Sequence, residues 1–293
     1  NSGTEALACY VSVERCQGVA SPDRAMPAIC EAIRDYAKAF GVPIPSVPDV
    51  EAESLLAATV IEWAALCAPK PLVVLFDEVD VLEGPAMISF LRQLRGGFAS
   101  RGVGTFPTSV ALVGMRDLRD YLAHSKDGIP VNPGSPFNIK EDSITIGNFG
   151  QADIVALTAQ HTGETGQAFG ADALERIWHY TSGQPWLVNA LAKKCVLETA
   201  PTGKVDTITA AHVDAAKELL IQSRATHIDS LGERLKDDRV RKVIQPMIIG
   251  QTDAALGRAD RDVEFCLDLG LIAWEGSLVI ANAIYREVIA RYL

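Results

Sequence analysis

The run of apolar residues at positions 72–76, followed at once by Asp77, Glu78, Val79 and Asp80, constrains the fold more than any other feature. The run shows none of the alternation typical of a strand with one face in water, so it predicts a strand covered by helices on both faces. Residues 109–113 predict a second buried strand, and helical patterns lie between the two. This alternation predicts parallel βαβ units in a doubly wound α/β sheet.

The order of the remaining patterns predicts three domains. Up to Phe149, the sequence predicts further strands over 8–13 and 142–146 and helices over 27–40, 51–66 and 87–98. After Phe149 the predicted strands stop, and helices are expected over 151–162, 171–181, 186–199 and 210–223. Two helices over 240–249 and 260–269, a β-hairpin over 270–280 and a helix from 284 follow the order of a winged helix-turn-helix. We therefore expect an α/β domain at 1–149, a helical lid at 150–225 and a winged helix at 226–293.

Composition excludes several classes of protein. The net charge of -10, from 27 basic and 37 acidic residues, argues against a chain that coats nucleic acid. No apolar run approaches the roughly 18 residues that a membrane helix needs, and the first residues show no signal peptide, so a cytoplasmic protein without a membrane segment is expected. The six cysteines form no C-x-x-C pair, which favours buried free thiols.

The carboxylates that follow the run 72–76 are the strongest candidates for chemistry. They stand where a buried strand leaves the sheet, and ligands bind at the carboxyl ends of strands in open α/β sheets. Asp77 would then hold Mg²⁺ and Glu78 would orient or deprotonate a water molecule, with Asp80 at the same nucleotide-binding edge. The alternative is that Asp77 or Asp80 only caps a helix or solvates the strand end. On this segment alone, both interpretations stay open.

Two further motifs support the first interpretation. Arg116 follows the strand at 109–113 and would face the same crevice, where a γ-phosphate needs a charged donor. The alternative interpretation is that Arg116 is a surface arginine paired with Asp117 or Asp120. Gly183 and Pro185 stand at the start of a predicted helix, where they either form a tight turn or belong to a lid that packs against a nucleotide base.

Five segments together resemble the bacterial AAA-like ATP-binding proteins, which are related to the STAND class of signalling nucleotidases. The segments are residues 72–80, 109–121, 135–140, 181–191 and 282–289. The resemblance implies that Asp77 and Glu78 are the Walker B pair, that Arg116 is the sensor arginine, and that Gly183 and Pro185 form the lid motif. It also implies ATP and Mg²⁺ as cofactors and matches the C-terminal winged helix.

The Walker A loop, G-x-x-x-x-G-K-[ST], is missing from these 293 residues. The one Gly-Lys pair, Gly203-Lys204, is followed by Val205 and lies between two predicted helices. We therefore expect residues 1–13 to correspond to the second strand of the core, with the first strand and the phosphate loop upstream. The chain alone should bind ATP poorly and be inactive, while the parent protein would be an ATPase.

Three functions remain in view. The leading hypothesis is an ATP-dependent molecular switch with a protein partner, or with self-association, through the lid or the winged helix. The alternatives are a non-hydrolysing interaction module on the same fold and a DNA-binding regulator. DNA is not favoured because Arg239, Arg241 and Lys242 stand beside Asp237 and Asp238.

Overall fold

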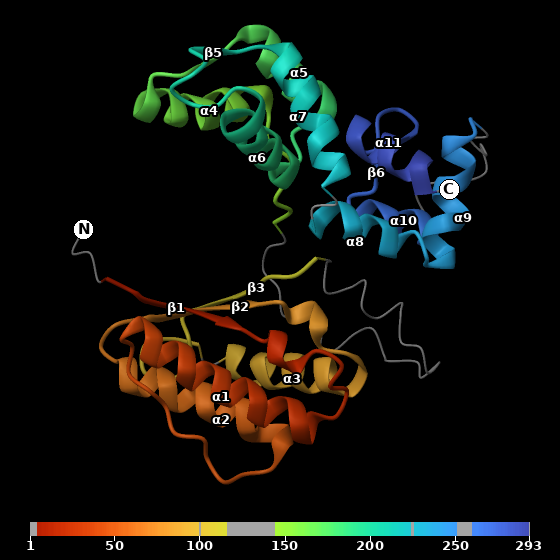
Figure 1. Cartoon of the computed structure of the whole chain (residues 1–293). Coiled ribbons are helices and arrows are strands. Elements are labelled where there is room, and N and C mark those ends of the chain that lie inside the picture. Colours follow the sequence, from red (N-terminus) through yellow and green to blue (C-terminus); the bar gives the residue numbers. More distant parts are fainter. Residues whose placement is uncertain (1–4, 100, 116–143, 224–225, 251–259, 293) are drawn as a thin grey trace. The chain divides into compact units, whose positions relative to one another are not determined.

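The computed structural model describes residues 5–99, 101–115, 144–223, 226–250 and 260–292. The chain forms two compact units, residues 1–144 and residues 145–293 (Figure 1). The first unit holds a parallel sheet with three long helices, and the second is built mostly of helices. The α/β class expected for the first half is therefore confirmed.

The sheet of the first unit has three strands among the described residues. They are β1 (Leu7–Ser12), β2 (Leu72–Asp77) and β3 (Ser109–Leu112), and they lie in this order with all pairs parallel. The register places Ser12 opposite Asp77 at the end of β2. Because parallel strands run the same way, their carboxyl ends meet at one edge of the sheet.

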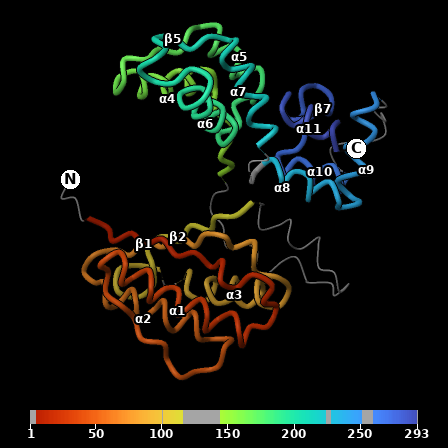
Figure 2. The backbone as a smooth tube through the Cα atoms, viewed as in Figure 1, coloured from red at the N-terminus to blue at the C-terminus, as the bar shows by residue number. Residues whose placement is uncertain are grey.

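The helices of this unit pack on one face of the sheet (Figures 1 and 2). They are α1 (Pro22–Phe40), α2 (Ala52–Cys67) and α3 (Gly84–Phe98). Residues of β2 alternate between buried and half-buried, and Phe76 meets Phe90 of α3 edge to face at 5.3 Å. The expectation that helices cover both faces is not met by the described residues. The sequence of β2 is apolar up to Phe76 because the residues on its second face are apolar as well, although these residues are only half-buried.

The start of α1 and the strand expected over 142–146 differ most from the sequence prediction in this unit. Helix α1 begins at Pro22 instead of at residue 27, since Pro22 occupies the first turn, where no amide donor is needed. Of the strand expected over 142–146, positions 142 and 143 lie outside the described residues, and residues 144–146 form no strand. A strand needs a partner, and none of the described residues pairs with the outer edge of β3.

The first half of the second unit contains four helices. These are α4 (Gln151–Thr165), α5 (Ala171–Thr181), α6 (Pro185–Lys194), which continues as a π-helical turn (Cys195–Thr199), and α7 (Ala210–Gln222). The prediction that strands stop after Phe149 is wrong in detail. Short strands β4 (Ala168–Phe169) and β5 (Thr207–Ile208) pair in parallel, and two residues are too few to leave a sequence pattern.

The second half of this unit follows the predicted order of elements, with one addition. It contains α8 (Thr226–Arg234), α9 (Asp238–Ile248), α10 (Arg261–Asp268), an antiparallel hairpin of β6 (Ile272–Trp274) and β7 (Leu278–Ile280), and α11 (Ala283–Tyr292). Helix α8 is the addition, since the sequence analysis assigned no element there.

The described residues of the second unit form two hydrophobic clusters. One is formed by residues of α4–α7, and the other mainly by residues of α8–α11, joined by Leu187, Leu220 and Ile221. Tyr180 packs against both clusters. All six cysteines are free and buried, as predicted. Among the described helices, none has the length and apolar character to cross a membrane.

Candidate functional site

Four carboxylates gather at the carboxyl edge of the sheet, and we call them the acidic edge: Glu14, Asp77, Glu78 and Asp80. Glu14 begins the 3₁₀ turn after β1, Asp77 is the last residue of β2, and Glu78 and Asp80 belong to the turn that follows β2. The structure thus brings together the three acids that the sequence predicts. Glu14 is an addition.

Asp77 has both carboxylate oxygens in hydrogen bonds. The Tyr10 hydroxyl donates to Asp77 Oδ2 at 2.7 Å, and the Glu78 amide donates to Asp77 Oδ1 at 2.9 Å. The bond to Asp77 is the main reason that the pKa of Tyr10 is raised to about 12. Because each carboxylate oxygen offers two lone pairs, Asp77 is oriented and can still accept from a further donor.

Glu78 occupies a strained position. Its backbone lies in the left-handed region, with φ 59° and ψ 32°, which costs a residue with a side chain about 1–2 kcal/mol. Its pKa is raised above the usual value, first by burial and then by the charges of the other three members of the acidic edge. Strain and a raised carboxyl pKa together are typical of functional sites more than of capping residues.

Asp80 presents a buried oxygen toward the end of β3. Its Oδ1 has no hydrogen-bond partner among the described residues. Gly114 lies next to it, since a Cβ built at Gly114 would stand 3.0 Å from this oxygen. The Val79 amide donates to the Val113 carbonyl at 3.1 Å, so the turn after β2 is fixed to the end of β3.

The acidic edge is not ion-paired within the described part of the chain. None of its members forms an ion pair with a described Lys, Arg or His side chain. Arg116, the predicted sensor, lies outside the described residues, and so do residues 135–140. The described carboxylates therefore leave negative charge for a cation to balance.

The acidic edge fits a Mg²⁺ ion that is shared with phosphates better than a protein-only metal cage. Among the described residues, no three His, Cys, Asp or Glu side chains converge on one point as metal ligands. Mg²⁺ in nucleotide sites commonly takes only one or two carboxylates, with water and phosphate oxygens completing the octahedron. Asp77, oriented by two donors, and the unpartnered oxygen of Asp80 supply that kind of ligand.

Gly183 and Pro185 have local structural roles in the second unit. Gly183 has φ 75°, and a Cβ there would stand only 1.9 Å from the Phe149 carbonyl oxygen. Pro185 begins α6, where the Gln184 side chain accepts from the Leu187 amide at 2.6 Å. The tight-turn interpretation accounts for both residues, and a contact with a nucleotide stays a prediction.

The three basic residues of α9 that the sequence analysis considered for DNA binding are paired with acids. They form the ion pairs Arg239–Asp237 at 2.7 Å, Lys242–Asp262 at 3.1 Å and Arg241–Asp238 at 3.9 Å. Phosphate binding requires cations that are free to replace counterions. These contacts weaken the case for a DNA interface.

Tyr10 and Glu14 are the site residues that sequence reasoning missed. The available signal is the alternation along β1, where Cys9 and Val11 are buried and Tyr10 is exposed. The register that brings Tyr10 beside β2 becomes visible only in the structure.

Comparisons with known proteins decide the fold. The chain is similar to the Walker-type ATPase PABY2304 of Pyrococcus abyssi, with a TM-score of 0.63, 12% identity, and coverage of 97% of this chain and 84% of that one. The chain has the fold of a P-loop ATPase. A second likeness is to the Aeropyrum pernix ORC2 protein, solved as ADPNP–ADP complexes, with a TM-score of 0.53, 16% identity, and coverage of 99% and 79%. No protein-family model matches the sequence, and no curated protein matches it significantly.

Proposed function

We propose that this chain is the main part of an ATP-dependent molecular switch of the AAA-like, STAND-related class. The acidic edge is the observation that carries the proposal: oriented and uncompensated carboxylates stand at the carboxyl ends of parallel strands in a P-loop ATPase fold. Ligands in open α/β folds bind at that edge. A capping role explains neither the strain at Glu78 nor the excess of negative charge.

Each member of the predicted site then has a distinct task. Asp77, held by Tyr10 and by the Glu78 amide, would hold the water shell of a Mg²⁺ ion. Glu78 leaves the strand one position later and orients the attacking water, for which a raised pKa suits a general base. When bound, Mg²⁺ would neutralise charge on the nucleotide phosphates. Arg116 as sensor and Gly183 with Pro185 as the lid motif belong to the proposal through the sequence resemblance. Asp80 belongs to it through its place in the turn after β2, where one of its oxygens has no partner among the described residues.

In this proposal the phosphate loop comes from outside these 293 residues, which contain no Walker A pattern. We place it after a strand that pairs with the outer edge of β3. Two observations support this position: none of the described residues pairs with that edge, and the strand expected over 142–146 does not form in its described part. A strand inserted there could pair in parallel with β3 along one edge and with a further strand along the other.

The division into a core at 1–149, a lid at 150–225 and a winged helix at 226–293 is part of the same proposal. The two hydrophobic clusters of the second unit support a division within it. We propose a cytoplasmic switch whose C-terminal helices bind a protein partner or a second copy. DNA is the less favoured alternative because the basic residues of α9 are ion-paired.

Calorimetry tests the proposal. Mg-ATP should bind weakly or not at all to the 293-residue chain, and tightly to a longer chain that includes the phosphate loop. In the longer chain, Asp77→Asn should weaken Mg-ATP binding by about tenfold or more, as expected for loss of a metal contact. The exposed Asp49→Asn is the matched control and should bind as the parent does. Low-micromolar binding by the short chain, or unchanged binding by Asp77→Asn, would overturn the assignment.

A further inference from the structure

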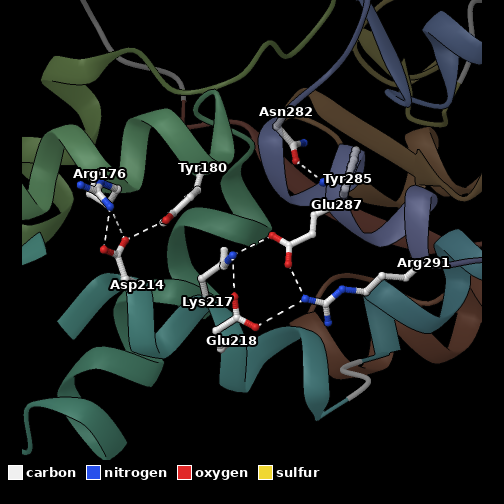
Figure 3. A network of polar contacts seen from close by, with 9 residues as sticks. All are labelled: Arg176, Tyr180, Asp214, Lys217, Glu218, Asn282, Tyr285, Glu287 and Arg291. Atoms are coloured by element: carbon white, nitrogen blue, oxygen red, sulfur yellow. Dashed lines mark hydrogen bonds and ion pairs between the residues drawn. The ribbon is translucent and has the colours of Figure 1, made fainter. Parts of the chain in front are cut away.

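Four side chains of alternating charge close into a ring between α7 and α11, and we call it the charge ring (Figure 3). Lys217 Nζ lies 2.7 Å from Glu218 Oε1 and 2.6 Å from Glu287 Oε2. Arg291 completes the ring by pairing with Glu287 and, at 3.5 Å, with Glu218. Each helix contributes one cation and one anion, so the ring as a whole is neutral.

The ring continues into α5 through Tyr180. The ammonium of Lys217 faces the Tyr180 ring at 5.3 Å from its centroid, close enough for a cation–π interaction. The Tyr180 hydroxyl donates to Asp214 at 2.8 Å, and Arg176 pairs with the same carboxylate at 2.5 Å (Figure 3). Helices α5, α7 and α11 are therefore joined by one continuous set of polar contacts.

This set of contacts lies at the boundary between the two hydrophobic clusters of the second unit. Tyr180 packs against both clusters, and α7 ends by inserting Leu220 and Ile221 into the C-terminal one. Lys217 is the most enclosed member of the charge ring, with 11% of its side chain exposed against 32% for Glu287 and 47% for Arg291. The ring thus has a shielded centre and a solvated rim.

We propose that the charge ring is a conformational device: it holds α11 on α7 so that the α4–α7 and α8–α11 halves move as one body, and Lys217 is the residue on which this depends. Any force that displaces the α4–α7 half is then passed to the C-terminal helices. This inference does not require that the protein bind ATP.

The dependence on Lys217 follows from its surroundings. Burial alone would lower the pKa of Lys217, but its bonds to Glu218 and Glu287 outweigh burial and raise that pKa. Removing the ammonium leaves two carboxylates facing each other with only Arg291 between them, and loss of one partner of an enclosed ion pair costs far more than loss of an exposed one. The apolar contacts of α11 would remain, so the helix should loosen without the unit unfolding.

Hydrogen exchange measured by mass spectrometry tests this device in the full chain. In Lys217→Met, amides of α11 should exchange about tenfold faster or more, while amides of α4 keep the parental rate. Lys217→Arg keeps the charge and should stay close to the parent. Lys236→Met is the matched control, because it removes an ion pair with Glu233 of similar length, 2.7 Å, whose partners are both 70% exposed.

Glu287→Gln serves as a milder variant if Lys217→Met folds poorly. A series of salt concentrations distinguishes stabilisation of α11 by the charge ring from stabilisation by apolar packing. Between low and high salt, α11 exchange should accelerate in the parent, because ions screen the solvated rim, and should respond less in either variant. Unchanged α11 exchange in both variants would overturn the proposal. Equal acceleration of α4 and α11 would overturn it as well, since the charges would then stabilise one cooperative fold.

Discussion

The acidic edge of the first unit and the charge ring of the second each hold four ionisable side chains, but they balance charge in opposite ways. In the charge ring every cation touches two anions, and the pKa of Glu218 is lowered, first through its bond to Lys217. In the acidic edge the described cations form no ion pair with the carboxylates, and the pKa of Glu78 is raised. The first arrangement stabilises the native state, and the second costs stability.

This difference indicates which cluster serves the structure and which serves a ligand. A protein that retains like charges and a left-handed glutamate at one edge gives up stability there, which is expected where a cation or a reacting group completes the site. The charge ring needs no ligand to be satisfied. We therefore assign binding chemistry to the acidic edge and a mechanical role to the charge ring.

Charge reversal should produce the largest contrast between the two clusters. Glu287→Lys places a third cation beside Lys217 and Arg291 and should destabilise the packing of α11 on α7 by about 2–3 kcal/mol. Glu14→Lys adds a cation to the acidic edge and should stabilise the first unit by up to about 1 kcal/mol. Urea unfolding followed by hydrogen exchange of peptides from each unit measures both. Destabilisation by both reversals would contradict the distinction.

Relief of backbone strain should give an effect of intermediate size at the acidic edge. Glu78→Gly should be more stable than Glu78→Ala by about 1 kcal/mol, since both remove the carboxylate but only glycine adopts the left-handed conformation freely. Thermal unfolding of the two variants provides the comparison. Equal stabilities would mean that Glu78 is not strained.

The pH dependence of stability should differ in sign between the clusters, and this is the smallest expected effect. The pKa of Glu78 is raised when folded, so its contribution to stability falls as pH rises from the unfolded value near 4.5 through the folded one. The pKa of Glu218 is lowered, so its contribution is present above about 4.5 and is lost as pH falls through the folded value. Denaturation curves across this range for Glu78→Gln and Glu218→Gln isolate each contribution. Slopes of the same sign would contradict the comparison.

The parallel sheet and most of the acidic edge were predictable because both depend on local sequence. An apolar run such as residues 72–76 predicts a strand, and the acids after it must lie at the strand's carboxyl end. The open face of the sheet was not predictable, because Val73 and Leu75 are apolar although half-buried. Apolar residues alone do not reveal how completely a face is covered.

The contacts that depend on distant residues were not predictable. Tyr10 reaches Asp77 only through the register of β1 on β2. Lys217 meets Glu287 across 70 positions of sequence, and no periodic pattern links two charges on separate helices. Gly183 could be read as a turn residue, but the close approach of the Phe149 carbonyl appears only in the fold.

Single-turnover ATP hydrolysis by the Glu78→Gln variant probes the catalytic role of the acidic edge, in the protein that carries the proposed phosphate loop. We expect the Mg-ATP affinity to stay at the parental value while the hydrolysis rate falls by about 10²-fold or more, as expected for loss of a general base. Asp77→Ala, measured alongside, should instead lose Mg-dependent binding. Hydrolysis at the parental rate by Glu78→Gln would show that the acidic edge is a strand end with capping carboxylates and no part in catalysis.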